Sequence, residues 1–210
     1  MVDPVIVRRE VADCSHLSFI REPLLQRIYA SRGITEPKDL EYQLKNLHNP
    51  ATLKDNDKAA TLLLAAIKNQ EKIIIVGDFD ADGATSTALS LLTLRRFGAT
   101  NTDFIVPNRF DFGYGLSVPI VDIAHQQGAK LIMTVDNGIS SIDGVARAKE
   151  LGITVVVTDH HLAGDELPIA DAIVNPNQPG CTFASKNLAG VGVAFYVMLA
   201  LRAKMRAEDY

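Results

Sequence analysis

The sequence predicts an α/β fold in which a mainly parallel sheet is flanked by helices and preceded by a helical amino-terminal lead-in. From residue 72 onwards, short β-branched runs alternate with longer stretches of helical periodicity, which is typical of parallel strands joined by crossover helices. The 210 residues are 47% hydrophobic and 22% charged, which is enough apolar material to bury a core. We expect a helical lead-in over residues 1–68 and an α/β domain over residues 69–210.

The lead-in carries apolar residues at mixed spacings of three and four. This pattern predicts helices over residues 23–31, 36–44 and 55–68. Gly33 and Thr35 are typical of a helix end followed by a new helix start. No residue pattern in the lead-in indicates chemistry.

The α/β domain is expected to contain five strands, each followed by a turn. Apolar runs predict strands over residues 72–76, 104–106, 130–135, 153–157 and 172–174. The intervening periodic stretches predict helices over residues 84–97, 117–127, 142–151 and 191–206.

Acidic residues follow three of the predicted strands. Ligand sites in open α/β sheets lie beyond the carboxyl ends of the strands, so these side chains are expected to meet at one edge. The residues concerned are Asp78, Asp80 and Asp82 after the first strand, Asp136 after the third, and Asp159, His160 and His161 after the fourth.

Gathered carboxylates repel one another unless cations neutralise them, so the cluster predicts a metal site. Carboxylates with imidazoles and no thiolate suit Mn²⁺ or Mg²⁺ better than a tetrahedral structural Zn²⁺. The number of ligands favours two ions, about 3.5–4 Å apart. The net charge of −4 does not exclude a nucleic-acid partner, because bound cations reverse the local sign of the charge.

Other interpretations explain single residues but not the set. Asp78, Asp80 and Asp82 match the opening of a calcium loop, but Leu89 stands where that loop needs a glutamate. A lone aspartate after a strand is more often a turn residue than a ligand. Gly190 and Gly192 lack the third glycine of a dinucleotide fingerprint, which favours tight packing at a helix start. Agreement among three strand ends is what favours the metal site.

The stretches at residues 78–87, 135–141 and 158–161 resemble the first three motifs of the DHH phosphoesterase superfamily. Residues 106–117, 175–177 and 188–196 are also similar to the bacterial single-strand-specific exonucleases of that superfamily. The resemblance implies a Mn²⁺- or Mg²⁺-dependent enzyme that degrades single-stranded DNA from its 5′ end in recombination and repair. Water activated by two metal ions, and no protein nucleophile, would break the phosphodiester bond.

The resemblance also implies roles for individual residues. Asp80, Asp82, Asp136 and His160 are expected to ligate metal, with Asp136 as the bridge between the ions and Asp78 as a further or supporting ligand. Catalysis would depend on Asp136, His160 and His161, the last in contact with the scissile phosphate or a metal. Asp159 is expected to orient an imidazole.

Arg109, Tyr114 and Ser117 occupy a glycine-containing loop after a predicted strand and are candidates for binding nucleic acid. Arginine offers a planar fork to phosphate oxygens, and tyrosine offers a face on which a base can stack. The alternative is that Arg109 packs on Phe110 or pairs with Asp111 at the surface.

The resemblance implies that such enzymes continue past residue 210 with a fourth metal-binding motif, a second domain and an OB-fold. We therefore expect this chain to be incomplete at its carboxyl end. A DHH-type phosphodiesterase for oligonucleotides or cyclic dinucleotides, a pyrophosphatase and an inactive truncated fragment remain alternatives.

The expected partners are single-stranded DNA and, for strand separation, a helicase and a single-strand-binding protein. With only two widely separated cysteines and no export signal or apolar run long enough to cross a membrane, the predicted location is cytoplasmic.

Overall fold

A computed structural model describes residues 5, 7, 10 and 12–210, apart from the side chain of Arg109. The chain divides into two compact units, residues 1–47 and residues 48–210.

The smaller unit contains one α-helix, α1 (Pro23–Ala30), among its described residues, together with short 3-10 turns. The prediction of an α-helix over residues 36–44 is wrong. Two 3-10 turns, Pro37–Leu40 and Leu44–Asn46, occupy this stretch. The Asp39 carboxylate accepts hydrogen bonds from the backbone N–H groups of Thr35 and Glu36, which closes a tight turn. Neither turn has a buried residue, so no core is available to stabilise a longer helix.

The larger unit is built on a parallel five-stranded sheet of order β2-β1-β3-β4-β5. The strands are β1 (Ile73–Val76), β2 (Thr102–Ile105), β3 (Leu131–Val135), β4 (Thr154–Thr158) and β5 (Ala172–Val174). The residues of β1, β3 and β5 are all buried, as expected for a sheet covered on both faces. The predicted parallel sheet is confirmed, with β2 displaced from the expected residues 104–106.

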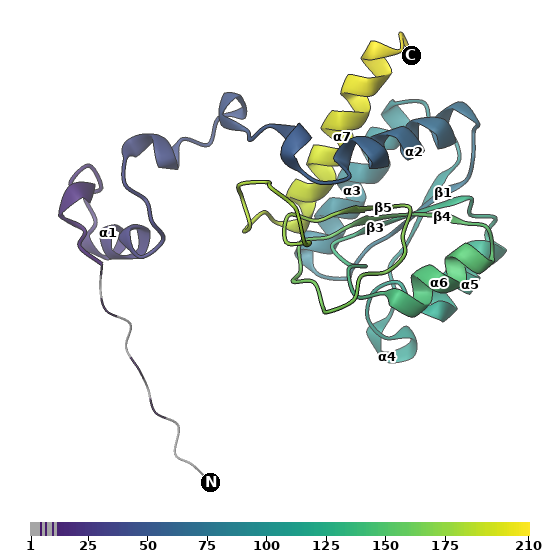
Figure 1. Cartoon of the computed structure of the whole chain (residues 1–210), viewed down its shortest axis with the longest axis horizontal. Helices are drawn as coiled ribbons and strands as arrows, with labels where there is room; N and C mark the ends of the chain where they lie inside the picture. Colours follow the sequence, from purple (N-terminus) through teal and green to yellow (C-terminus); the bar gives the residue numbers. More distant parts are fainter. Residues whose placement is uncertain (1–4, 6, 8–9, 11) are drawn as a thin grey trace. The chain divides into compact units, whose positions relative to one another are not determined.

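Helices cover the two faces of this sheet (Figure 1). On one face lie α2 (Asn56–Lys68), α3 (Ala81–Arg96) and α7 (Gly190–Ala207), and on the other lie α5 (Val118–Gln126) and α6 (Ile142–Glu150). Successive side chains of a strand point to opposite faces. Accordingly Ile73 and Ile75 enter the core with α2 and α7, while Ile74 and Val76 enter the core with α5 and α6.

The two compact units divide after Leu47, ahead of the boundary between residues 68 and 69 that the sequence predicts for the α/β domain. The cause is α2, which packs against α7 and β5 and buries Leu63, Leu64 and Ile67 in the larger unit. A four-residue helix, α4 (Arg109–Phe112), was not predicted.

The strand order reverses beside β1, which has β2 on one side and β3 on the other. Ligands of open α/β sheets bind at such a switch point, outside the carboxyl ends of the strands. The acidic residues lie at this edge of the sheet. Among the described helices, none is long and apolar enough to cross a membrane.

Candidate metal centre

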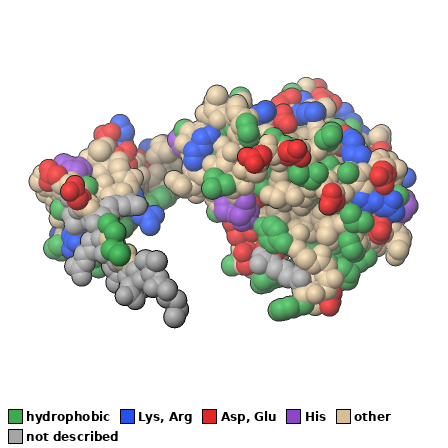
Figure 2. Space-filling view, turned by 60° about the horizontal axis from the view of Figure 1, so that its bottom comes forward, with side chains coloured by type: hydrophobic (Ala, Val, Ile, Leu, Met, Phe, Trp, Pro, Cys, Tyr) green, Lys and Arg blue, Asp and Glu red, His purple; other side chains and the backbone are tan. Residues whose placement is uncertain are grey.

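The structure brings the acidic residues and histidines after β1, β3 and β4 to one edge of the sheet. Side-chain atoms of Asp78, Asp80 and Asp136 lie within 4.8 Å of one another, as do those of Asp136, His160 and His161. Asp136 belongs to both groups. On the surface of the larger unit, histidine side chains lie beside carboxylates (Figure 2). The sequence prediction of a shared edge therefore holds for these five residues.

Asp136 is buried and has a left-handed backbone conformation. It is 2% exposed and has a φ of 62°, in the left-handed region that aspartate tolerates better than most side chains. Its N–H donates to the Thr158 carbonyl at 3.0 Å, and its own carbonyl accepts from the Tyr114 hydroxyl at 3.3 Å. Backbone strain held by surrounding contacts is characteristic of functional sites.

His160 lies beside Asp136, and the tautomer of its neutral ring is set by a contact on the other side of the ring. Its Nδ1 lies 2.9 Å from the Leu188 carbonyl oxygen, which can only accept a hydrogen bond, so Nδ1 carries the hydrogen. In the neutral ring, Nε2 then presents a lone pair. Nε2 lies 3.1 Å from Asp136 Oδ1 and 3.7 Å from Asp82 Oδ2. Asp136 Oδ1 is buried and accepts no hydrogen bond from any described residue.

The electrostatics of Asp136 reflect this crowding. Burial, followed by the nearby carboxylates of Asp82 and Asp80, raises the pKa of Asp136 to about 7. The ionised form of Asp136 is therefore unfavourable, and either protonation of its carboxylate or a bound cation would relieve the repulsion.

Asp80 and Asp82 also form hydrogen bonds at helix starts. Asp80 is the N-cap residue of α3 and accepts from the Gly83 N–H at 2.9 Å. Asp82 accepts from the first N–H groups of α7, those of Gly190 at 2.7 Å and Val191 at 2.8 Å. Carboxylate oxygens have more than one lone pair, so these bonds leave acceptor capacity toward the cluster.

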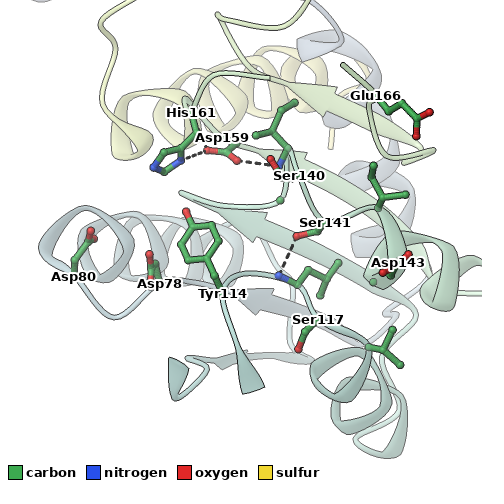
Figure 3. Close-up of a pocket in the computed structure, with 16 residues that line it drawn as sticks. Asp78, Asp80, Tyr114, Ser117, Ser140, Ser141, Asp143, Asp159, His161 and Glu166 are labelled. Atoms are coloured by element: carbon green, nitrogen blue, oxygen red, sulfur yellow. Dashed lines mark hydrogen bonds and ion pairs between the residues drawn. The ribbon is translucent and has the colours of Figure 1, made fainter. Parts of the chain in front are cut away.

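Asp159 is a buried residue that organises both histidines. Its Oδ1 accepts from His161 Nδ1 at 2.7 Å and from the His160 N–H at 2.7 Å, and its Oδ2 accepts from the Ile139 N–H at 2.9 Å. Figure 3 shows Asp159 between His161 and the loop that follows β3. Burial raises the pKa of Asp159, but hydrogen bonds from His161 and Ile139 outweigh it and the pKa is lowered. The same bond to Asp159 raises the pKa of His161.

Tyr114 and Ser117 line a cavity of about 920 Å³ beside the cluster, together with Asp78, Asp80 and His161 (Figure 3). Tyr114 is 46% exposed, and its ring meets that of His161 edge-on at 6.1 Å. Ser117 precedes α5 as its N-cap residue. Arg109 is the first residue of α4, and its side chain lies outside the described part of the structure.

Sequence reasoning missed several residues around this site. Ser140, Ser141, Asp143 and Glu166 line the same cavity. The two serines lie in the stretch 135–141 but have no predicted role, and Asp143 and Glu166 have no sequence signal that distinguishes them from surface acids. Gly190 was predicted to serve tight packing, and this is confirmed: a Cβ atom there would lie 2.6 Å from Asp136 Oδ1.

Comparison with known proteins identifies relatives over almost the whole chain. The chain is 56% identical over 202 residues to the single-stranded-DNA-specific exonuclease RecJ of Haemophilus influenzae, covering 96% of this chain and 35% of that protein. It is 55% identical over 203 residues to the enzyme of the same name from Escherichia coli, covering 97% of this chain and 35% of that protein. The chain thus spans about a third of the length of these curated relatives.

Solved structures agree with these relatives. An exonuclease RecJ bound to manganese superposes with a TM-score of 0.68 at 33% identity, over 76% of this chain and 40% of that chain. RecJ from Thermus thermophilus in complex with Mn²⁺ also has a TM-score of 0.68, at 32% identity over 85% of this chain and 24% of that chain. The N-terminal domain of the DHH family matches residues 72–210, and the chain therefore belongs to the DHH family.

Proposed function

We propose that this chain carries the metal centre of a phosphodiesterase that hydrolyses single-stranded DNA from the 5′ end, in recombination and repair. The observation that carries the proposal is the contact between His160 Nε2 and the buried Asp136 Oδ1 at 3.1 Å. With hydrogen on Nδ1, the Nε2 lone pair of His160 and the unpartnered Asp136 Oδ1 lie close together, and a divalent cation that both atoms bind would relieve their repulsion. Similarity to RecJ enzymes, including structures bound to manganese, supports Mn²⁺ or Mg²⁺ as that cation.

The donor set suits two such ions. Asp78, Asp80 and Asp136 would hold one, and Asp136 with His160 and Asp82 would hold the other, so Asp136 would be shared. Carboxylate oxygens and imidazole nitrogen without thiolate match the preferences of Mn²⁺ and Mg²⁺. Bound cations at such a site supply Lewis acidity toward a phosphate and lower the pKa of a coordinated water.

His161 is proposed to act on the substrate through a proton. Asp159 holds Nδ1 of this ring at 2.7 Å, which directs Nε2 away from Asp159. Because the bond to Asp159 raises the pKa of His161, the charged form is favoured and can donate a hydrogen bond to a phosphate oxygen. Asp159 itself is a positioning residue in this scheme.

Nucleic acid would lie along the cavity beside the cluster. Tyr114 offers an exposed ring for stacking, and Ser117 offers a hydroxyl at the wall of the same cavity. Arg109 remains a predicted phosphate contact. The proposal includes a cytoplasmic location and cooperation with a helicase and a single-strand-binding protein, which would supply separated strands.

The proposal is tested by two measurements on the same samples. Mn²⁺ affinity is followed by electron paramagnetic resonance, and release of mononucleotides is followed from 5′-labelled single-stranded DNA, with duplex DNA and cyclic dinucleotides as comparison substrates. Asp136→Asn removes the shared ligand, and Asp165→Asn removes one charge from an exposed loop position as the matched control.

We expect the unchanged chain and Asp165→Asn to bind Mn²⁺ and release mononucleotides, and Asp136→Asn to do neither. A folded chain that binds no Mn²⁺ would contradict the metal centre. Binding without release would assign hydrolysis to the longer enzymes alone.

A further inference from the structure

The segment that follows β5 forms hydrogen bonds with the backbone of both His160 and His161. Asn175 and Asn177 are the first and third residues after the strand, and their side-chain amides turn back toward the end of β4. Asn175 Nδ2 donates to the His161 carbonyl at 3.0 Å, and Asn177 Nδ2 donates to the His160 carbonyl at 2.6 Å. The two histidines are therefore held by their backbone as well as by their rings.

Asn177 forms a second hydrogen bond, and this one reaches the segment that carries the acceptor of the His160 ring. Its Nδ2 also donates to the Lys186 carbonyl at 3.2 Å. Two residues further along the chain, the Leu188 carbonyl accepts from His160 Nδ1 at 2.9 Å. One amide group thus ties the backbone of His160 to the short segment that holds its ring.

The surrounding contacts make this connection rigid. The Asn177 N–H donates to Asn175 Oδ1 at 2.7 Å, and Asn175 is fully buried. Lys186 Nζ donates to the carbonyls of Pro176 at 2.6 Å and Cys181 at 2.9 Å. These bonds close the loop on itself and hold Lys186, two residues before Leu188, against residues 176, 177 and 181.

The chemistry of the amide fixes its orientation. Both partners of Asn177 Nδ2 are carbonyl oxygens, which only accept, so the NH₂ group and not the oxygen of Asn177 must face them. An aspartate at this position would place an oxygen against two oxygens. The site therefore distinguishes the amide from its isosteric acid.

We propose that Asn177 is a positioning residue that sets the tautomer and ring orientation of His160. By holding the segment that carries the Leu188 carbonyl, it keeps the hydrogen on Nδ1 and leaves the lone pair on Nε2, which lies 3.1 Å from Asp136 Oδ1 and 3.7 Å from Asp82 Oδ2. The hydrogen-bond partner of one ring nitrogen decides what the other can bind. The proposal rests on the proposed function for its consequence, metal binding, but its structural part concerns the metal-free chain alone.

The substitution Asn177→Asp gives a test whose sign is informative. It adds a negative charge near the site, which by electrostatics alone would strengthen cation binding. Loss of the correct His160 ring orientation would instead weaken cation binding. Changes to groups that orient metal-binding histidines typically cost about 10–100-fold in affinity. We expect the Kd for Mn²⁺ to rise about tenfold or more. Asn187→Asp, an exposed position in the same loop, adds the same charge as the matched control and is expected to stay within about twofold of the unchanged chain.

The second readout is the ring itself. In the metal-free chain labelled with ¹⁵N-histidine, at a pH where the imidazole is neutral, the nitrogen shifts report which ring atom carries the hydrogen. We expect hydrogen on Nδ1 of His160 in the unchanged chain and in Asn187→Asp, and a mixture with hydrogen on Nε2 in Asn177→Asp. Asn177→Ala, which removes both donors without adding charge, is measured alongside in case the acid does not fold.

A loss of stability alone would lower the unfolding temperature and leave the tautomer of the folded molecules unchanged. Folded Asn177 variants that keep both the tautomer and the Mn²⁺ affinity of the unchanged chain would overturn the proposal. A tautomer that depends on Asn177 in a chain that binds no Mn²⁺ would support the positioning role and overturn the proposed function.

Discussion

At the scale of single residues, Asp136 combines features that disfavour the folded state without a cation. It is buried, it holds a left-handed backbone conformation, and its Oδ1 faces the His160 ring at 3.1 Å. Neighbouring carboxylates add to the conflict. Such residues are typical of sites where stability is given up for function.

The pKa of Asp136 predicts how this conflict depends on pH. The pKa is about 7 in the fold against a usual value of 3.8, so the folded state binds the proton more tightly than the unfolded state does. The resulting stability is fully present below pH 3.8 and is lost as the pH rises through 7. In metal-free solution, Asp136→Asn should therefore be more stable than the unchanged chain at pH 8, by at most about 4 kcal/mol. At pH 5 most of the difference should disappear.

Urea unfolding in EDTA at the two pH values measures this effect, with Asp165→Asn as the control. Asparagine tolerates the left-handed conformation as aspartate does, so backbone strain does not confound the comparison. Equal free energies of unfolding at pH 8 would show that Asp136 is not destabilising in the folded chain.

The residues of the cluster were predictable because each follows an apolar run, and parallel strands bring their ends to one edge. The groups that orient the cluster were not. The Leu188 carbonyl belongs to the backbone and has no sequence signature, and the amide of Asn177 reaches His160 across 17 residues of chain. Long-range hydrogen bonds of this kind depend on tertiary packing, which no local pattern encodes.

At the scale of elements, the start of α7 depends on residues from other parts of the chain. Its N-cap residue, Ala189, has no side-chain oxygen, and Asp82 accepts the hydrogen bonds of the first N–H groups of the helix instead. The sequence predicted α7 to within one residue at each end. It predicted α3 to begin at residue 84, whereas α3 begins at Ala81 because Asp80 is its N-cap residue.

Asp82→Ala should remove this cap and lower the free energy of unfolding by about 1 kcal/mol. Hydrogen exchange of the Gly190 and Val191 amides should become faster. Ala189→Ser, added to this variant, supplies a local cap at a residue with extended backbone angles. The double variant should regain the lost free energy of unfolding and the slow hydrogen exchange of these amides, but it should not regain Mn²⁺ affinity. This result would separate the capping role of Asp82 from metal binding. Recovery of both by the added serine would argue against Asp82 as a ligand.

Gly190 allows the start of α7 to lie close to Asp136 because it has no Cβ atom. In Gly190→Ala, the new Cβ would lie 2.6 Å from Asp136 Oδ1 and 2.9 Å from its Cγ, so Asp136 or the helix start must shift. We expect a loss of about 1–3 kcal/mol in stability, the usual range for overpacking, together with weaker Mn²⁺ binding. Gly164→Ala, where the nearest atom would be 3.9 Å away, is the control. Unfolding curves and Mn²⁺ titrations that coincide for the two variants would contradict the close approach.

At the scale of the whole molecule, the unit that carries the cluster begins before the first strand of the sheet. Composition placed the boundary at residue 68 because α2 has the helical periodicity of the lead-in. The contacts of α2 place it in the larger unit, because Leu63, Leu64 and Ile67 pack into the same core as α7. A helix with an apolar face can pack on the unit before it or after it, and periodicity does not distinguish the two.

Two truncated chains test this assignment. Residues 48–210 should unfold in one cooperative transition and bind Mn²⁺ as the whole chain does, because the described contacts of the cluster all lie in this part. Residues 69–210 lack α2, and each fully buried leucine or isoleucine contributes about 1.5–3 kcal/mol. The free energy lost with three such side chains is comparable to the total stability of a domain, about 5–15 kcal/mol.

The shorter chain should therefore bind a hydrophobic dye, elute as aggregates in gel filtration and show no cooperative thermal transition by circular dichroism. If residues 69–210 instead fold and bind Mn²⁺ with unchanged affinity, α2 belongs functionally to the lead-in, and the boundary lies where the composition placed it.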